Sequence, residues 1–71
     1  MQITYNKDTD LLYFRLDNQV QDVVNKRLSD EVVLDIGAKD RIVGIEILDA
    51  SKHLNLDNLL PVDYEVTTKS S

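Results

Sequence analysis

The stretch Arg41-Ile-Val-Gly-Ile-Glu-Ile-Leu48 decides the fold of this chain. Read as a strand, it has apolar residues on both alternating sets of positions, and only Gly44 and Glu46 interrupt the second set. A strand with one exposed face needs a single apolar set. We therefore expect this strand to lie centrally in a sheet, or to have its second face covered.

The residues on either side extend this strand into a hairpin and a helix. Glu31 to Ile36 alternates in the same way, and Gly37-Ala-Lys-Asp40 supplies a tight turn in which Gly37 is able to take a positive φ. After the strand, Asp49 is expected to cap a short helix from Ala50 to about Asn55, because its carboxylate can accept the first free N–H groups.

The residue pattern of the N-terminal half predicts three further strands. Gln2 to Asn6 alternates as an edge strand, Asn6 to Asp10 has turn chemistry, and Leu11 to Asp17 resumes as a strand that completes a first hairpin. Val20 to Leu28 fits either a strand or one face of a helix, and its valines favour the strand.

These elements predict an α+β fold, an antiparallel β-meander of four to five strands with one short helix after the last main strand. Residues 1–55 would form the single domain. Residues 56–71 would be a C-terminal extension, with Val62 to Thr67 either an extra strand or a partner-binding tail. The expected core is one apolar set of strand positions: Leu12, Phe14, Leu16, Val32, Leu34, Ile36, Val43, Ile45 and Ile47.

Composition limits the classes of function. The chain has 71 residues, no cysteine and a net charge of −5, with acids and bases interspersed. Disulfides and thiolate-held metals are thereby excluded, and the missing basic stripe argues against direct nucleic-acid binding. We expect no membrane segment and a cytoplasmic location.

Several blocks of this sequence resemble a small prokaryotic family known as domain of unknown function 2283. They are Tyr5, Asp8, Asp10, Leu12 to Leu16, Leu34-Asp35, and the run from Ile42 to Ser51. One departure lies in the turn before the last strand, where the family's glycine is replaced by Asp40 and the glycine stands at Gly37. The resemblance implies a meandering antiparallel sheet with a short helix and no established activity. It also implies an antitoxin-like role, since family members often lie beside a small toxin-like protein that cleaves RNA.

Three charged residues, Arg15, Asp35 and Glu46, lie on three predicted strands, each at a position that faces away from the expected core. If those strands are neighbours, the charges meet on one face. They would form either a partner-docking patch or a solvated sheet face with an ordinary ion pair, and the second interpretation is favoured.

Other candidate sites have simpler explanations. Asp49 and His53 stand four apart, but two ligands are too few for a stable metal site. Asp8 and Asp10 lack the further acids and the central glycine of a calcium loop, so they are expected to form the turn. No nucleophile motif occurs, and a domain this small has little room for an enclosed pocket. We therefore expect no enzyme, no cofactor and no metal.

The remaining signal is surplus apolar surface. Leu11, Tyr13, Val33, Ile42 and Leu48 lie opposite the expected core and need a second covering layer. The cover could be the chain's own segment from Leu56 to Val66, a second copy, or a different protein.

The leading hypothesis is a small interaction domain that neutralises a basic, RNA-cleaving toxin. The alternative is a structural homo-oligomer without catalytic activity. The acidic charge would steer a basic partner, and an extended tail could lie in its groove. The expected partner-binding residues are Tyr13, Arg15, Glu46, Leu59, Leu60, Val62 and Tyr64.

Overall fold

The computed structural model describes residues 1–59 and 64–67. Leu60 and Val62 from the predicted tail lie outside the described residues. The strands are β1 (Gln2–Asn6), β2 (Leu11–Arg15), β3 (Val24–Arg27), β4 (Val32–Ile36) and β5 (Ile42–Ile47). Two short 3-10 turns are η1 (Ala38–Asp40) and η2 (Leu56–Asn58), and the α-helix is α1 (Ala50–His53).

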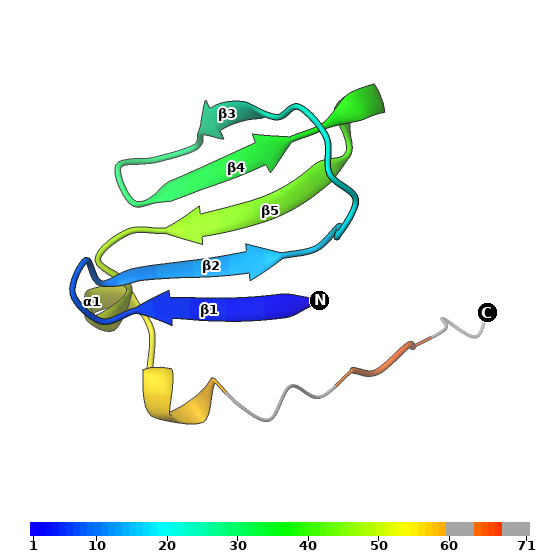
Figure 1. Cartoon of the computed structure of the whole chain (residues 1–71). Helices are drawn as coiled ribbons and strands as arrows, with labels where there is room; N and C mark the ends of the chain where they lie inside the picture. The colour runs from blue at the N-terminus through cyan, green and yellow to red at the C-terminus, as the bar shows by residue number, and fades with distance from the viewer. Residues whose placement is uncertain (60–63, 68–71) are drawn as a thin grey trace.

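All five strands form one open antiparallel sheet in the order β1-β2-β5-β4-β3 (Figure 1). Hairpins and a central β5 were predicted correctly, but the sheet is not a sequential meander. The chain leaves β2, crosses the end of the sheet through residues 16–23, and enters β3 at the far edge. It then returns through β4 to β5, which pairs with β2 in a Greek-key-like path.

Several elements are shorter than the sequence predicted. The second strand ends at Arg15 rather than Asp17, and only Val24–Arg27 of the segment from Val20 to Leu28 is a strand. The predicted helix from Ala50 to Asn55 is reduced to Ala50–His53. Residues 64–67 have no regular secondary structure, and Tyr64 is 88% exposed.

The β4–β5 turn differs from its prediction in backbone conformation. Gly37 has φ −99°, whereas Lys39 and Asp40 both have φ 58°. Two consecutive positive φ angles, with the Arg41 N–H donating to the Ala38 carbonyl at 3.2 Å, define a type I′ turn. Gly37 is needed for space instead, because a Cβ there would overlap the Gln21 and Val43 side chains.

An irregularity in β5 changes which way Val43 faces. Pairing passes from Asp35–Gly44 to Ile36–Ile42, so Val43 has no partner in β4. This bulge places Val43, 3% exposed, beside Tyr13 and Asp35 instead of beside Ile45 as predicted. Ile42 takes its place opposite Ile36.

Cross-strand pairing assigns the remaining strand residues to one of the two faces of the sheet. The apolar face consists of Ile3, Tyr5, Leu12, Phe14, Val24, Lys26, Val32, Leu34, Ile36, Ile42, Ile45 and Ile47. The polar face consists of Gln2, Thr4, Asn6, Leu11, Tyr13, Arg15, Asn25, Arg27, Val33, Asp35, Gly44 and Glu46, with Val43 added by the bulge.

Most of the predicted core residues are not buried. Of its nine residues only Leu12 and Val43 are buried, and Leu16 is exposed. The helix lies behind the β1–β2 end of the sheet (Figure 1), where Leu12 and Ala50 are fully buried. Four helical residues are too few to cover the rest of the apolar face. The surplus apolar surface therefore lies on the predicted core side, while on the opposite side Val33 and Val43 are buried among polar side chains.

Candidate functional site

The polar face is organised around Asp35, which is 8% exposed. Its carboxylate accepts two hydrogen bonds, one from the Tyr13 hydroxyl at 3.1 Å and one from Asn25 Nδ2 at 2.6 Å. The same Asn25 amide donates to Glu46 Oε2 at 3.5 Å. Side chains from β2, β3, β4 and β5 thus form one network across the sheet, which we call the polar cluster: Tyr13, Asn25, Asp35 and Glu46.

The pairing register explains why these residues meet. One row across the sheet runs Arg15, Gly44, Asp35 and Asn25, and the next runs Tyr13, Glu46, Val33 and Arg27. Tyr13 therefore starts one row away from Asp35. Its ring reaches Asp35 by leaning over Gly44, where a Cβ would overlap the Tyr13 hydroxyl and ring. The glycine and the acid that interrupt the second apolar set of β5 both serve this network.

Two arginines flank the polar cluster. The Arg15 guanidinium lies over the Tyr13 ring at 5.6 Å from its centroid, within the range of a cation–π contact. Arg27 Nη1 donates to the carbonyls of Ser29 and Asp30, at 3.3 and 2.8 Å, which fixes it against the β3–β4 turn. The sequence predicted that Arg15 would meet Asp35 and Glu46 on one face. It shares that face, but its contact is with the tyrosine rather than with either carboxylate.

The cluster has shifted proton affinities with identifiable causes. Burial, followed by the hydrogen bond and charge of Asp35, raises the pKa of Glu46, and the Arg27 charge only partly offsets this. Burial and the hydrogen bond to Asp35 also raise the pKa of Tyr13. A second carboxylate beside Asp35 therefore retains its proton to a higher pH than an isolated glutamate.

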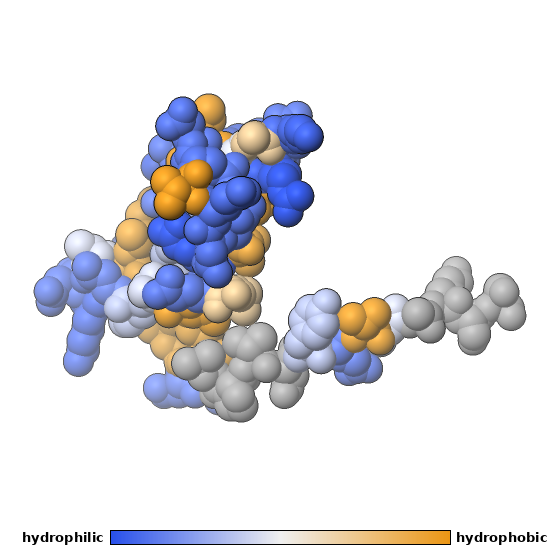
Figure 2. All heavy atoms as spheres, turned by 45° about the vertical axis from the view of Figure 1, so that its right-hand side comes forward, coloured by the Kyte–Doolittle hydropathy of each residue, from blue (hydrophilic) through white to orange (hydrophobic). Residues whose placement is uncertain are grey.

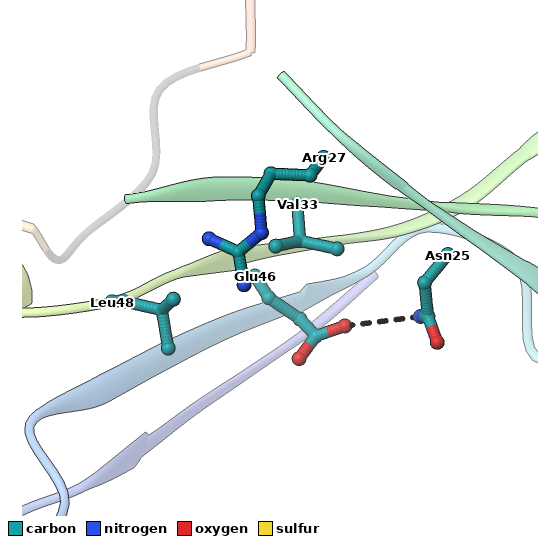
Figure 3. Close-up of a pocket in the computed structure, with 5 residues that line it drawn as sticks. All are labelled: Asn25, Arg27, Val33, Glu46 and Leu48. Atoms are coloured by element: carbon teal, nitrogen blue, oxygen red, sulfur yellow. Dashed lines mark hydrogen bonds between the residues drawn. The ribbon is translucent and has the colours of Figure 1, made fainter. Parts of the chain in front are cut away.

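Two hollows open beside the cluster. One has a volume of about 360 Å³ and is lined by Asn25, Arg27, Val33, Glu46 and Leu48 (Figure 3). The other, of about 400 Å³, lies between Tyr13, Arg15, Asp35, Val43 and the loop residues Gln19, Val20, Gln21 and Val23. Each combines apolar walls with charged groups at its edge. Such hollows can hold a partner side chain whose stem is apolar and whose tip is polar.

The predicted partner-binding residues fall into two groups. Tyr13, Arg15 and Glu46 gather on the polar face. Leu59 is half-buried beyond η2 and Tyr64 is exposed in the C-terminal segment, and neither lines the two hollows. Asn25 was missed because it lies in the segment whose conformation the sequence left open, so its face could not be assigned.

A second hydrogen-bonded group ties the first hairpin to the helix. Asp10 accepts hydrogen bonds from the Tyr5 hydroxyl at 2.6 Å, the Ser51 N–H at 3.0 Å and the Ser51 hydroxyl at 2.7 Å. The Ala50 N–H donates to the Asp10 carbonyl at 3.0 Å. These donors, the Tyr5 hydroxyl first, lower the pKa of Asp10.

The predicted cap was therefore wrong. Asp49 adopts a left-handed conformation, φ 52°, and makes no side-chain capping bond, while Asp10 performs that task from another part of the chain. His53 lies 3.9 Å from the Glu31 carboxylate. Among residues 1–59 and 64–67, no three His, Asp or Glu side chains gather in a group that could hold a metal ion. In the same part of the chain, no helix is both long enough and apolar enough to span a bilayer.

Comparison with known proteins gives a family but no characterised relative. Neither the curated proteins nor the solved structures contain a match to this chain. The model of one protein family does match, over residues 2–51, which contain the whole sheet, both hydrogen-bonded groups and the start of α1. The chain therefore belongs to the family described as protein of unknown function (DUF2283).

Proposed function

We propose that this chain is a small cytoplasmic protein-interaction domain whose polar face binds a basic partner. In its specific form, the proposal is that the partner is an RNA-cleaving toxin that the domain neutralises. The observation that carries it is the grouping of Tyr13, Arg15 and Glu46 around two adjacent hollows on one face. Tyrosine and arginine are among the residues that contribute most to protein–protein affinity.

Charge supports a basic partner. The chain carries a net charge of −5, which would accelerate encounter with a positively charged surface. Glu46 borders the hollow in Figure 3, with Val33 and Leu48 beside it. A lysine or arginine side chain entering there would pack its stem on the apolar walls and place its cation near the carboxylate.

The C-terminal segment would supply a second contact. Tyr64 and Val66 are exposed and alternate in the sequence, as in peptides that bind in a partner's groove. A truncation after Asn55 tests this part separately. If partner binding is undiminished, the C-terminal segment has no role in the mechanism.

The test begins with recovery of the partner from the native host and its identification. The purified partner is then titrated calorimetrically with wild type, Glu46→Lys and Arg15→Ala. We expect a basic partner, an affinity that weakens as salt rises, and at least a tenfold loss with Glu46→Lys. Asp8→Lys is the matched control, because it makes the same charge change at an exposed position in the β1–β2 turn, outside both the polar face and the C-terminal segment. An acidic partner, or equal losses for Glu46→Lys and Asp8→Lys, would refute the proposal.

The toxin-neutralising role has its own test. The identified partner is assayed for RNA cleavage with and without a stoichiometric amount of this chain. We expect cleavage by the partner alone and its loss in the complex. A partner that binds but cleaves no RNA would leave the interaction domain in place and remove the antitoxin role.

A further inference from the structure

The apolar face is the largest uncovered feature of the sheet. Tyr5, Val24 and Ile42 are exposed, and Ile3, Phe14, Val32, Leu34, Ile36, Ile45 and Ile47 are only half-buried. Figure 2 shows hydrophobic side chains reaching the surface in the body of the molecule, between groups of hydrophilic ones. The buried apolar residues of the described chain are Leu12, Val33, Val43 and Ala50. Such a small buried set is unusual for a folded domain of this length.

The chain's own elements leave most of this face open. In the described residues, the extensive contacts between elements are those between neighbouring strands. The helix α1 is confined to the β1–β2 end, and η2 follows it in the chain, below β1 in the view of Figure 1. The surface over β5, β4 and β3 therefore needs a cover from outside the described chain.

We propose that a second copy of this chain provides the cover, with the apolar faces of two sheets packed against each other across a two-fold axis. The product is a two-sheet sandwich, in which the inner faces interdigitate about 10 Å apart. Each copy presents the same surface to the other, which is the usual arrangement in a symmetric dimer.

The chemistry of the face suits pairing with itself. Within the five strands the structure describes, Lys26 is the one charged residue on the apolar face, and it lies on the edge strand β3. Its flexible stem can carry the ammonium group into water at the rim. Two copies can therefore meet without burying a charge, although each carries a net charge of −5. The acids of the strands, Asp35 and Glu46, both lie on the polar face.

The size of the open face suits a reversible dimer. The three strands β3, β4 and β5, of about five residues each, cover roughly 14 by 17 Å, or about 240 Å² in projection. Two such open faces remove roughly 500–1,000 Å² from water, which is the size of weak, concentration-dependent interfaces. Because the polar face stays outside the sandwich, this inference does not depend on the proposed function.

Ile42 and Val23 provide a matched pair of test positions. Ile42, on the apolar face, is 46% exposed, and Val23, in the loop beside the polar face, is 43% exposed. Aspartate at either position replaces a similarly exposed apolar side chain, so both monomers should tolerate it. In a two-fold dimer, however, Ile42→Asp introduces two charges into the buried interface.

The experiment is sedimentation equilibrium of the full chain from low to high micromolar concentration, with circular dichroism as a check on folding. We expect wild type and Val23→Asp to sediment at twice the monomer mass. Dimerisation should be about 100-fold weaker in Ile42→Asp. The melting temperature of wild type should also rise with protein concentration, which tests dimerisation without a variant.

Other results would overturn the inference. A wild-type chain that is monomeric throughout, with a melting temperature independent of concentration, would show that no second copy covers the face. A dimer that is broken by Val23→Asp and not by Ile42→Asp would show association through the other face. Assembly beyond a dimer would exclude the closed two-fold pair. Failure of any of these arms leaves the partner titration on the polar face unaffected.

Discussion

Replacing Gly44 by alanine should destabilise the protein, although glycine is a poor residue for a strand. Taken alone, the added methyl group would stabilise β5 by about 0.5–1 kcal/mol. In this sheet the new Cβ would overlap the Tyr13 hydroxyl and ring. The ring must move away, which breaks its hydrogen bond to the Asp35 carboxylate.

The magnitude follows from these two opposed effects. A hydrogen bond to a charged group contributes about 1.5–3 kcal/mol. Subtracting the gain from removing a glycine, we expect Gly44→Ala to lower the free energy of unfolding by about 1–2 kcal/mol. The assay is urea unfolding followed by circular dichroism, at one fixed protein concentration because association would shift the midpoint.

A double-mutant cycle isolates the cause. In a Tyr13→Val background no ring lies over position 44, so Gly44→Ala should become stabilising by about 0.5–1 kcal/mol. Gly37→Ala is the control, because its Cβ would meet Gln21 and Val43, and its cost should be the same in both backgrounds. An equal cost of Gly44→Ala with and without the tyrosine would refute the close-approach explanation.

Three further changes test the turn and the two hydrogen-bonded groups. Asp40 has φ 58°, a conformation that glycine adopts without strain, so Asp40→Gly should raise the free energy of unfolding, measured in urea, by about 1 kcal/mol. Asp30 does not have a positive φ, so the control Asp30→Gly should not raise it. The pKa of Asp10 is lowered in the fold, so its contribution to stability is present above pH 3.8 and is lost as pH falls through the lowered value. Melting curves of Asp10→Asn should lack this acid-side loss, and a slope as steep as in wild type would contradict the role of Asp10. The pKa of Glu46 is raised, so the melting temperature of wild type should fall as pH rises from 4.5 through the raised value. If Glu46→Gln shows the same fall, Glu46 is not its source.

The sequence was most informative where residues alternate. The pattern from Arg41 to Leu48 correctly placed β5 in the interior of the sheet. The alternation of β4 and β5 also correctly placed Asp35 and Glu46 on the same face. Alternation does not reveal a bulge, however. The unpaired Val43 reverses the facing of Val43 and Ile42, so both were assigned to the wrong side.

The other differences arise from contacts between distant residues. Asp49 has the right residue type and position for a cap, yet the helix start is bound by Asp10, which lies 41 residues before Ser51. The strand order was also out of reach, since a hairpin pattern gives local pairing but not the partner of each outer edge. Asn25 could be placed on the polar face only once β3 had a register with β4.

The junction between β2 and β5 governs the order in which this sheet assembles. Hairpin β1–β2 and the three strands β3–β4–β5 can each form from neighbours in the chain, whereas the β2–β5 seam joins residues about thirty positions apart. Closing that seam carries the largest loop-entropy cost, so the two halves should form first and dock afterwards. Asp10, in the turn of the β1–β2 hairpin, accepts hydrogen bonds from Ser51 just after β5 and so stabilises the pairing of β2 with β5. Hydrogen exchange should accordingly detect opening between β2 and β5 before either half melts.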